Sequence, residues 1–357
     1  MGPQQVTFFL PTALAAVGRT LGIRFVLANK KAQVWIMMRK SVFKSRLTVK
    51  EFALKYGIYI GFVLIFIVFA VIRKKFLTVQ NLMNILDQYA YLIVCAMGMY
   101  FVIMVGGVDL SNGGLIALSS VIGAAIMIRT KSGLLGCVVI LAMCILAGII
   151  NGMSVVKLGL PAFIATLAFD NIWRGSAYTY TSAQTLSGIP SSITALYFTK
   201  VCGLRVTTLI MIGIFLILFY LMTFTGYSKR LYAVGGNKKA AKVMGIKATL
   251  VMISAYAICG CCTGISSVLM VSYMASASAS VASSLSLDCI AAVIIGGASA
   301  NGGEGKLTGA VVGALLFAMI KNGLNLMGLS YFYQLVATGV IIYIACAIDR
   351  QRVKAGL

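Results

Sequence analysis

The residues of this sequence that could do chemistry begin with an aspartate in a glycine-rich segment between two apolar runs. The segment reads Gly106-Gly107-Val108-Asp109-Leu110-Ser111-Asn112-Gly113-Gly114. The glycines expected to break the helix are Gly106, Gly107 and Gly113. Asp109 or Ser111 can accept hydrogen bonds from the first N–H groups of the next helix. An acid buried in a membrane bundle is also a candidate for a transport pathway or gate, so both roles stay open for Asp109, Ser111 and Asn112.

A second glycine-rich segment has a similar pattern. It reads Gly296-Gly297-Ala298-Ser299-Ala300-Asn301-Gly302-Gly303-Glu304-Gly305-Lys306. Its expected helix-breaking glycines are Gly296, Gly297, Gly302 and Gly303. Transporters often contain internal repeats with broken helices at corresponding positions, so a true repeat and a chance match remain alternatives. Asn301, and Asp288 in the preceding apolar run, are further candidates for the pathway or a gate.

Other chemistries find no support among the residues. A phosphate-binding loop needs Gly, four residues and then Gly-Lys-Ser/Thr, whereas Leu307 follows Gly305-Lys306. The nine cysteines include a cluster at 259–262, but the chain has no histidine and no second cysteine cluster. Metal and redox sites normally need such partners. We therefore predict no catalytic residue, no metal site and no ATP site or other cofactor in this chain.

A basic link at 226–249 joins two apolar runs. Asn237 can cap a short helix that begins at Lys238, and Gly245 can end it. A short helix on the cytoplasmic face of a membrane protein suits docking into a groove of a partner. The docking residues we expect are Asn237, Lys238, Lys239, Ala240, Ala241 and Gly245. The alternative is a solvated loop without a partner.

The elements that position these residues must lie in a membrane. Hydrophobic residues make up 61% of the 357 residues and charged residues 10%, and the mean hydropathy is +1.00. Soluble domains carry about 25% charged residues, so this chain could not cover its surface in water. The net charge of +23 resides in an amino-terminal arm and in links between apolar runs. Anionic lipid is the expected partner of such links, and nucleic acid is not.

The apolar runs predict an all-α, polytopic transmembrane helix bundle. A helix that crosses a bilayer needs about 20 mostly apolar residues, and about ten runs approach this length. The predicted spans are 54–72, 88–105, 113–129, 134–156, 161–178, 205–225, 250–273, 286–298, 307–326 and 331–348. The fifth and eighth lie beside Gly- or Pro-rich segments, which predicts broken or re-entrant helices. Gly-xxx-Gly spacings at Gly148/Gly152, Gly260/Gly264 and Gly309/Gly313 predict close helix packing.

The basic residues predict the orientation. Ten spans would place the arm 1–50, the link 226–249 and the carboxyl-terminal tail on one face, which is then cytoplasmic. Both termini are therefore expected in the cytoplasm, with the membrane domain covering 51–350. The basic residues at 73–75 lie on the wrong side of this arrangement. The arm 1–50 is interpreted as a basic interfacial segment or as residues added by an upstream start codon.

A charged pair is expected within the fifth span. Asp170 and Arg174 stand four residues apart, where two side chains meet on one face of a helix. A single charge at membrane depth is costly, so the two are predicted to pair.

From about residue 50 to 350 the sequence resembles the ribose/galactose/xylose-type permeases of ATP-binding-cassette importers. The segments that carry the resemblance are Gly106–Ser111, Asn151-Gly152, Leu160–Leu167, Arg174-Gly175, Tyr232–Asn237, Ala240–Ile246, Leu287–Ala292 and Gly296–Gly305. Each is weak alone, but their shared order is specific. In one departure, Lys239 stands where the docking loop of many importers has a glutamate.

The resemblance implies a subunit that moves a monosaccharide-type sugar across the cytoplasmic membrane of a bacterium. It implies a second permease copy, two ATPase subunits that hold ATP and Mg²⁺, and an extracytoplasmic solute-binding protein. A different importer cargo, such as a nucleoside or an amino acid, stays open. A secondary transporter of a small polar solute is the other alternative, with Asp109 and Asp288 as its coupling acids. A channel would need a selectivity-filter motif and a membrane enzyme would need a catalytic cluster, and neither is visible in this sequence.

Overall fold

The structure is a computed structural model that describes residues 62, 63, 65–330, 332–340 and 343. The described helices belong to one compact unit, Tyr56–Leu357. The predictions for the arm 1–50, and for the orientation of the two termini, lie outside the described residues. Much of the first and last predicted spans, 54–72 and 331–348, is also outside them.

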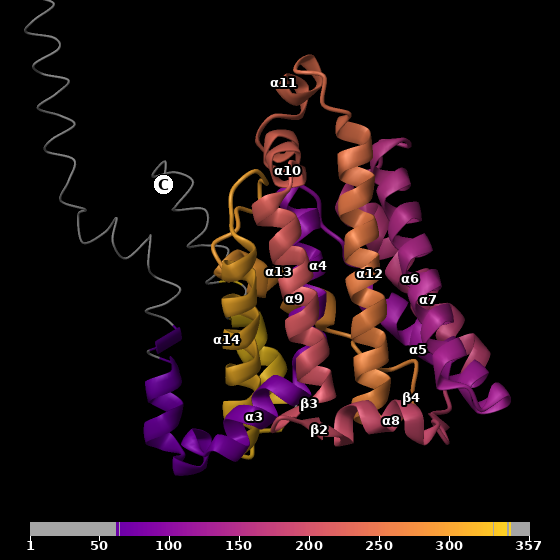
Figure 1. The fold of residues 1–357 in the computed structure, drawn as a ribbon, viewed down its shortest axis with the longest axis vertical. Helices are drawn as coiled ribbons and strands as arrows, with labels where there is room; N and C mark the ends of the chain where they lie inside the picture. Colours follow the sequence, from indigo (N-terminus) through magenta and orange to yellow (C-terminus); the bar gives the residue numbers. More distant parts are fainter. Residues whose placement is uncertain (1–61, 64, 331, 341–342, 344–357) are drawn as a thin grey trace, which may run out of the picture. The chain divides into compact units, whose positions relative to one another are not determined.

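Helices dominate the described chain (Figure 1). A short 3-10 helix, η1, spans Lys74–Leu77. The α-helices are α3 Val79–Gln88, α4 Ala90–Met104, α5 Asn112–Thr130, α6 Gly133–Val156, α7 Ala162–Thr181, α8 Ser191–Phe198, α9 Val206–Phe224, α10 Tyr227–Gly236, α11 Lys238–Val243, α12 Ala248–Met274, α13 Leu285–Ile295 and α14 Leu307–Leu326. Residues 65–72 and 332–340 are also helical. The predicted all-α membrane bundle is confirmed.

The number of spans is lower than the predicted ten within the described residues. Five helices are long and apolar enough to cross a membrane, namely α5, α6, α9, α12 and α14. A sixth span results if α3 and α4, which meet at a 51° bend, are taken together. Helix α7 is long enough, but Asp170, Asn171 and Arg174 lower its hydropathy. Helix α13 has 11 residues and is about 16 Å long, too short to cross a bilayer by itself.

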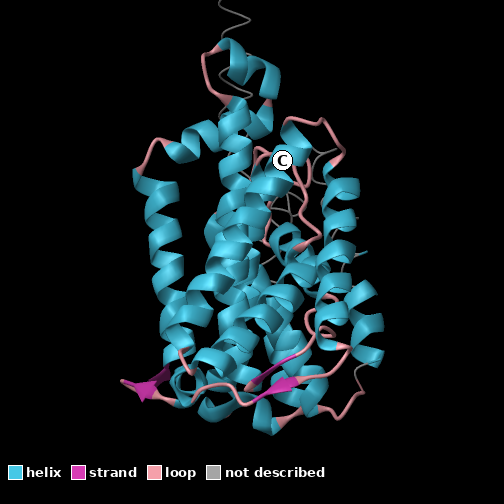
Figure 2. Cartoon of the chain, turned by 90° about the vertical axis from the view of Figure 1, so that its right-hand side faces the viewer, coloured by secondary structure: helices cyan, strands magenta, loops and turns pink. Residues whose placement is uncertain are grey.

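Four short strands supplement the helices. β1 (Leu186–Ser187) pairs antiparallel with β4 (Ser276–Ala277), and Leu186 lies opposite Ala277. β2 (Lys200–Val201) and β3 (Leu204–Arg205) form a hairpin. Both pairs lie at the end of the bundle opposite α11 (Figure 2). Each pair is a two-stranded sheet that ties together loops between helices.

Helix α4 is at the centre of the bundle. Fourteen of its residues are buried, and the core around it includes residues from α9, α10, α12, α13 and α14. The glycine spacings provide close packing, as predicted. A Cβ on Gly148 would lie 2.4 Å from the Tyr256 carbonyl oxygen, and one on Gly313 would lie 2.0 Å from that of Ala292. These backbones touch because neither glycine carries a side chain.

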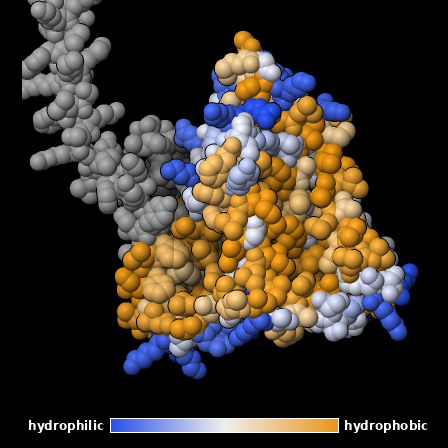
Figure 3. Space-filling view, viewed as in Figure 1, coloured by the Kyte–Doolittle hydropathy of each residue, from blue (hydrophilic) through white to orange (hydrophobic). Residues whose placement is uncertain are grey.

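Polarity divides the surface along the long direction of the bundle. Hydrophobic residues cover the middle of the visible face, and hydrophilic residues gather at its two ends (Figure 3). The exposed apolar residues include Leu134 on α6, Ile217 on α9 and Leu250 on α12. Large exposed apolar surfaces of this kind need lipid around them. The structure therefore agrees with a multi-pass membrane protein.

Candidate functional site

The first predicted break lies between α4 and α5 and holds a buried polar cluster. Asp109 is 1% exposed. Its Oδ1 accepts hydrogen bonds from Ser111 N at 2.9 Å and Ser111 Oγ at 2.7 Å. The side-chain amide of Asn151 on α6 donates to Ser111 Oγ at 2.6 Å and lies 3.4 Å from both carboxylate oxygens. The break thus brings Asp109, Ser111 and Asn151 into contact inside the bundle.

The helix-breaking glycines divide into two groups. Gly106, with φ +74°, and Gly107 lie in the break itself. Gly113 is the second residue of α5, so the break ends at Ser111, earlier than predicted. The reason is that other elements satisfy the first N–H groups of α5, which lets the helix begin at Asn112.

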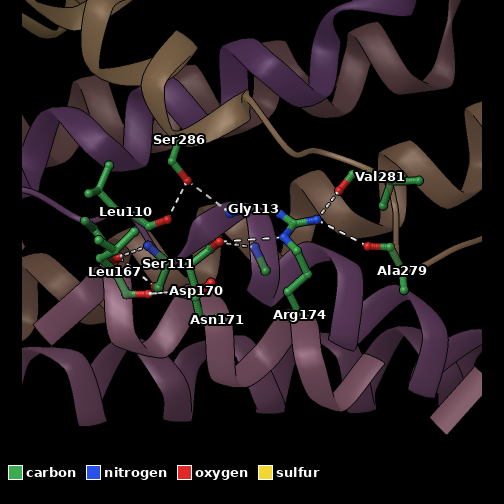
Figure 4. A network of polar contacts seen from close by, with 12 residues as sticks. Leu110, Ser111, Gly113, Leu167, Asp170, Asn171, Arg174, Ala279, Val281 and Ser286 are labelled. Atoms are coloured by element: carbon green, nitrogen blue, oxygen red, sulfur yellow. Dashed lines mark hydrogen bonds and ion pairs between the residues drawn. The ribbon is translucent and has the colours of Figure 1, made fainter. Parts of the chain in front are cut away.

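Two side chains from other helices cap the amino terminus of α5. Gly114 N donates to Asp170 Oδ1 of α7 at 2.5 Å. Gly113 N donates to Ser286 Oγ of α13 at 3.1 Å, and that hydroxyl donates to the Leu110 carbonyl at 2.8 Å (Figure 4). Ser111, the N-cap residue, makes no side-chain capping bond of its own. The sequence gives no signal for a cap that comes from another helix.

Arg174 extends this network into the loop between β4 and α13. Its Nε lies 3.6 Å from Asp170 Oδ2, so the predicted pair along α7 is confirmed. Its Nη1 also donates to the carbonyl oxygens of Ala279 and Val281, at 3.2 and 3.0 Å (Figure 4). The guanidinium therefore joins α7 to a non-helical segment. Such backbone needs partners of this kind at membrane depth.

Asn112 faces α12 and lies away from any surface. It is fully buried, and its Oδ1 accepts a hydrogen bond from Thr263 Oγ1 at 3.1 Å. Its amide nitrogen lies 3.6 Å from Cys259 Sγ. Within the described residues no group of three or more His, Cys, Asp or Glu side chains could hold a metal ion. Cys259 is thus a packing and weakly polar contact of Asn112.

Asp288 lies in the first turn of α13 and pairs with a lysine that the sequence did not single out. Its Oδ2 forms an ion pair with Lys321 Nζ of α14 and accepts a bond from Ser284 Oγ at 3.1 Å. Asp288 is 1% exposed. A buried charge of this kind is found paired with an opposite charge. The pair fixes α13 against α14.

A third ion pair lies near the strand end of the bundle. Arg205 Nε lies 3.1 Å from Asp87 Oδ2, and the guanidinium stacks over the Tyr197 ring at 4.1 Å. Thr208 Oγ1 donates to the other oxygen of Asp87. These residues come from α3, α8, β3 and α9. The cluster holds the α3–α4 bend against the α8–α9 region.

The short helix predicted in the basic link is present as α11, and its docking role stays a prediction. Asn237 Oδ1 accepts a hydrogen bond from Ala240 N at 2.9 Å, so Asn237 is the cap, and Gly245 follows the helix with φ +80°. Lys238 and Lys239 are exposed. Ala241 is fully buried and packs the helix onto the bundle, so a partner could not contact it directly. Figure 1 shows α10 and α11 together at one end.

The second glycine-rich segment lies beside α10. Gly296 ends α13, and Gly297, Gly302 and Gly303 all have positive φ. Asn301 is exposed, and its carbonyl oxygen would lie 3.2 Å from a Cβ on Gly106. The two predicted breaks therefore touch each other. Asn301, however, lies apart from the buried cluster that contains Asp109.

Comparison with known proteins places these features in a family. Residues 81–346 match the family described as "Branched-chain amino acid transport system / permease component". The ribose import permease protein RbsC of Bacillus subtilis strain 168 is 37% identical over 300 residues, which cover 84% of this chain and 93% of that protein. RbsC of Escherichia coli K12 is 30% identical, with 88% of this chain and 100% of that protein covered.

Another relative is named for D-allose transport. The D-allose transport system permease protein AlsC of Escherichia coli K12 is 32% identical over 299 residues, or 83% of this chain and 91% of that protein. No solved structure gives a significant match. The family match covers most of the chain, and the relatives match nearly over their full lengths. The chain therefore belongs to the family of permease components of ATP-binding-cassette importers that includes the ribose and allose permeases.

Proposed function

We propose that this chain is the membrane-spanning subunit of an importer for a monosaccharide-type sugar, and that a separate ATPase docks on α11. The observation that carries the proposal is the exposed outer face of α11. Val243 is 89% exposed and Met244 is 67% exposed. Both follow Lys238, Lys239 and Lys242 in the sequence. Hydrophilic residues gather at the end of the molecule where Figure 1 labels α11 (Figure 3). Large apolar side chains exposed to water in this way suit a protein interface.

The way α11 is held in place favours a docking helix rather than a solvated loop without a partner. A helix of six residues is too short to be stable alone. Here Asn237 caps it, and Ala241 is buried against the bundle. The outer face is thereby held in a fixed geometry, which lowers the entropic cost of binding a partner. This end would face the cytoplasm, where the ATPase holds ATP and Mg²⁺.

The opposite end supports a second partner. Its exposed basic residues are Arg73, Lys74, Lys75, Arg129, Lys131 and Lys200. No acid among the described residues is exposed at this end. Asp87, Asp109 and Asp288 are at least 94% buried, Asp170 lies within α7, and Glu304 lies in the loop beside α10. This basic face would attract an acidic surface of an extracytoplasmic solute-binding protein. Such a partner also accounts for the basic residues at 73–75, which the orientation rule does not explain.

The cargo assignment rests on the relatives. Three of them are named for ribose or D-allose, whereas the family description names branched-chain amino acids. Overall identity of 30–37% over nearly whole chains supports a monosaccharide, such as ribose or D-allose, as the cargo. The chain would form the pathway together with a second permease copy. As the two ATPase subunits come together and separate again, the pathway would open to one side of the membrane and then to the other.

A secondary transporter is less well supported. Its coupling acids would have to bind and release an ion. Asp288 is paired with Lys321, and Asp109 is bonded to Ser111 and Asn151. Neither carboxylate is available without disrupting contacts between helices.

The proposal is tested by reconstitution in proteoliposomes with the cognate ATPase and binding protein. We expect uptake of labelled ribose or allose that needs both ATP and the binding protein. Leucine uptake would contradict the sugar assignment, and uptake driven by an ion gradient without ATP would contradict the importer. Val243→Asp with Met244→Asp should abolish ATPase pull-down. Val201→Asp, at an exposed apolar residue of the opposite end, is the matched control and should leave pull-down unchanged.

A further inference from the structure

Three backbone segments meet directly beneath the docking helix. They are the end of α4 with the following break (104–107), the last turn of α10 (235–236), and the loop between α13 and α14 (298–305). Gly303 N donates to the Met104 carbonyl at 3.0 Å. We call the four glycines at this meeting point the glycine junction. They are Gly106, Gly235, Gly302 and Gly303.

No side chain separates these segments. A Cβ on Gly235 would lie 1.9 Å from the Met104 carbonyl oxygen and 2.5 Å from Gly303 N. One on Gly303 would lie 2.6 Å from Gly236 N, and one on Gly302 would lie 2.6 Å from Gly106 N. All of these neighbours are backbone atoms, which cannot move aside as a flexible side chain can. The three segments therefore contact each other backbone to backbone.

Two tyrosines reinforce the junction from inside the bundle. Tyr232 Oη of α10 donates to the Gly305 carbonyl oxygen at 2.8 Å, and it lies 2.8 Å from Tyr100 Oη of α4. Leu231 and Val234 of α10 are buried in the same core. Helix α10 is thus fixed to α4 and to the loop before α14 by hydrogen bonds as well as by packing.

The junction lies between the two parts of the molecule that an importer must connect. On one side, α10 ends at Gly236, and the cap Asn237 leads into α11, the proposed docking helix. On the other side, Gly106 and Gly107 lead into the buried cluster of Asp109, Ser111 and Asn151. A displacement of α11 that moves α10 must therefore also displace the α4–α5 break or tear the junction apart.

We infer that Tyr232 and Gly235 are coupling residues, which pass the movement of the docking helix through the glycine junction to the α4–α5 break and so link ATP hydrolysis to opening of the pathway. This inference rests on the proposed function. It chooses between two routes into the bundle, because α11 is joined to α10 on one side and continues through Lys247 into α12 on the other. The alternative is that the movement passes along α12. The two routes can be distinguished because Tyr232 of α10 contacts the glycine junction side and Tyr227 of α10 contacts α12.

Tyrosine substitutions separate the two routes. Tyr232→Phe keeps the ring and removes the hydroxyl that contacts Gly305 and Tyr100. Tyr227→Phe is the matched control, because Tyr227 is also on α10 but its hydroxyl lies 2.9 Å from Ser254 Oγ of α12. In proteoliposomes with the ATPase and binding protein, we expect Tyr232→Phe to bind the ATPase and hydrolyse ATP normally. Its sugar uptake per ATP should fall about fivefold, the size expected for loss of one buried hydrogen bond.

Two adjacent glycines give an independent comparison. A Cβ on Gly235 would meet backbone at 1.9 Å, whereas one on Gly236 would meet nothing within 4 Å. We expect Gly236→Ala to transport like the wild type and Gly235→Ala to lose uptake while ATPase pull-down remains. Size-exclusion chromatography of both variants shows whether Gly235→Ala folds. If it does not fold, Tyr232→Phe alone decides the inference.

The outcomes are distinct. Normal coupling in Tyr232→Phe overturns the inference, and so does an equal loss in Tyr227→Phe, since the effect would then belong to α10 in general. A wild-type protein that binds no ATPase contradicts the proposed function itself, before any variant is compared. Uncoupling in Tyr232→Phe, with Tyr227→Phe normal, supports the junction as the route.

Discussion

Asp170 of α7 caps the amino terminus of α5, with its Oδ1 accepting the hydrogen bond of Gly114 N at 2.5 Å. The same carboxylate pairs through its Oδ2 with Arg174 one turn later. One side chain thus satisfies an unpaired N–H at a helix start and neutralises a cation. The two roles can be separated by substitution.

Asp170→Ala should lower the thermal stability of the detergent-solubilised protein, because it removes both roles. We expect a loss of about 2 kcal/mol, the scale for leaving a buried donor and a charged group unsatisfied. Asp170→Asn should lose less, since asparagine is also a good acceptor for a helix start. Neutralising Arg174 in the Asp170→Ala background should recover only part of the loss. Full recovery would mean that the contact with Gly114 contributes nothing.

Asp87→Ala should be the most destabilising single change at the strand end of the bundle. It would leave Arg205 partly buried without its carboxylate partner, which costs about 3 kcal/mol when one member of a buried pair is removed. A double variant, Asp87→Asn with Arg205→Gln, should be more stable than Asp87→Ala because no charge is left unpaired. Thermal unfolding of the wild type, Asp87→Asn, Arg205→Gln and the double variant measures the coupling between the two residues. An additive result would show that the pair is not coupled.

Asp109→Asn should fold normally and retain uptake. Asparagine can still accept the bonds of Ser111, and its amide could donate to Asn151 Oδ1, which is buried without a hydrogen-bond partner among the described residues. Asp109→Ala should lose about 1 kcal/mol, the typical net contribution of a lost hydrogen bond. Uptake assays on both variants are the decisive measurement. A folded Asn variant that binds the ATPase but does not transport would instead make the negative charge of Asp109 part of the pathway or gate.

Asn237→Ala should weaken ATPase binding through loss of the cap on α11. The cap contributes about 1 kcal/mol, which corresponds to about a fivefold change in affinity if the helix must form to bind. Asn237→Asp should behave like the wild type. Ala241→Asp should abolish binding, because it places a charge in a fully buried position. Unchanged binding of the ATPase to Asn237→Ala and Ala241→Asp would exclude α11 as the docking helix.

Charge reversal of the basic face should weaken association with the binding protein. Lys74→Glu with Lys75→Glu should lower the affinity about tenfold at low salt, mainly by slowing association. The difference from the wild type should shrink as salt screens the interaction. Lys238→Glu with Lys239→Glu, at the opposite end, is the control with the same change in net charge. An effect of equal size in the control would mean that only the net charge matters.

Several features of this protein can be predicted from its sequence, because they depend on composition or on residues that are close together along the chain. The low charge content specifies a membrane environment, since no water-soluble surface could be built from it. Asn237 was predicted to cap α11 because a cap is decided by the residue and its next three neighbours. Asp170 and Arg174 were predicted to pair because a spacing of four on a helix brings side chains together. The ordered motifs indicated the family.

The tertiary structure decided which groups distant in sequence satisfy one another. Gly113 was predicted to break a helix, yet it lies inside α5 because Asp170 and Ser286 arrive from other helices to cap it. Arg205 and Lys321 carried no signal of their own, and Tyr232 was only part of a family motif, since each acquires its contacts from a partner far away in the sequence. The glycine junction depends on three segments meeting in space. Capping and pairing within a helix are fixed by spacing along the chain, whereas contacts between helices exist only once packing has chosen which backbones touch.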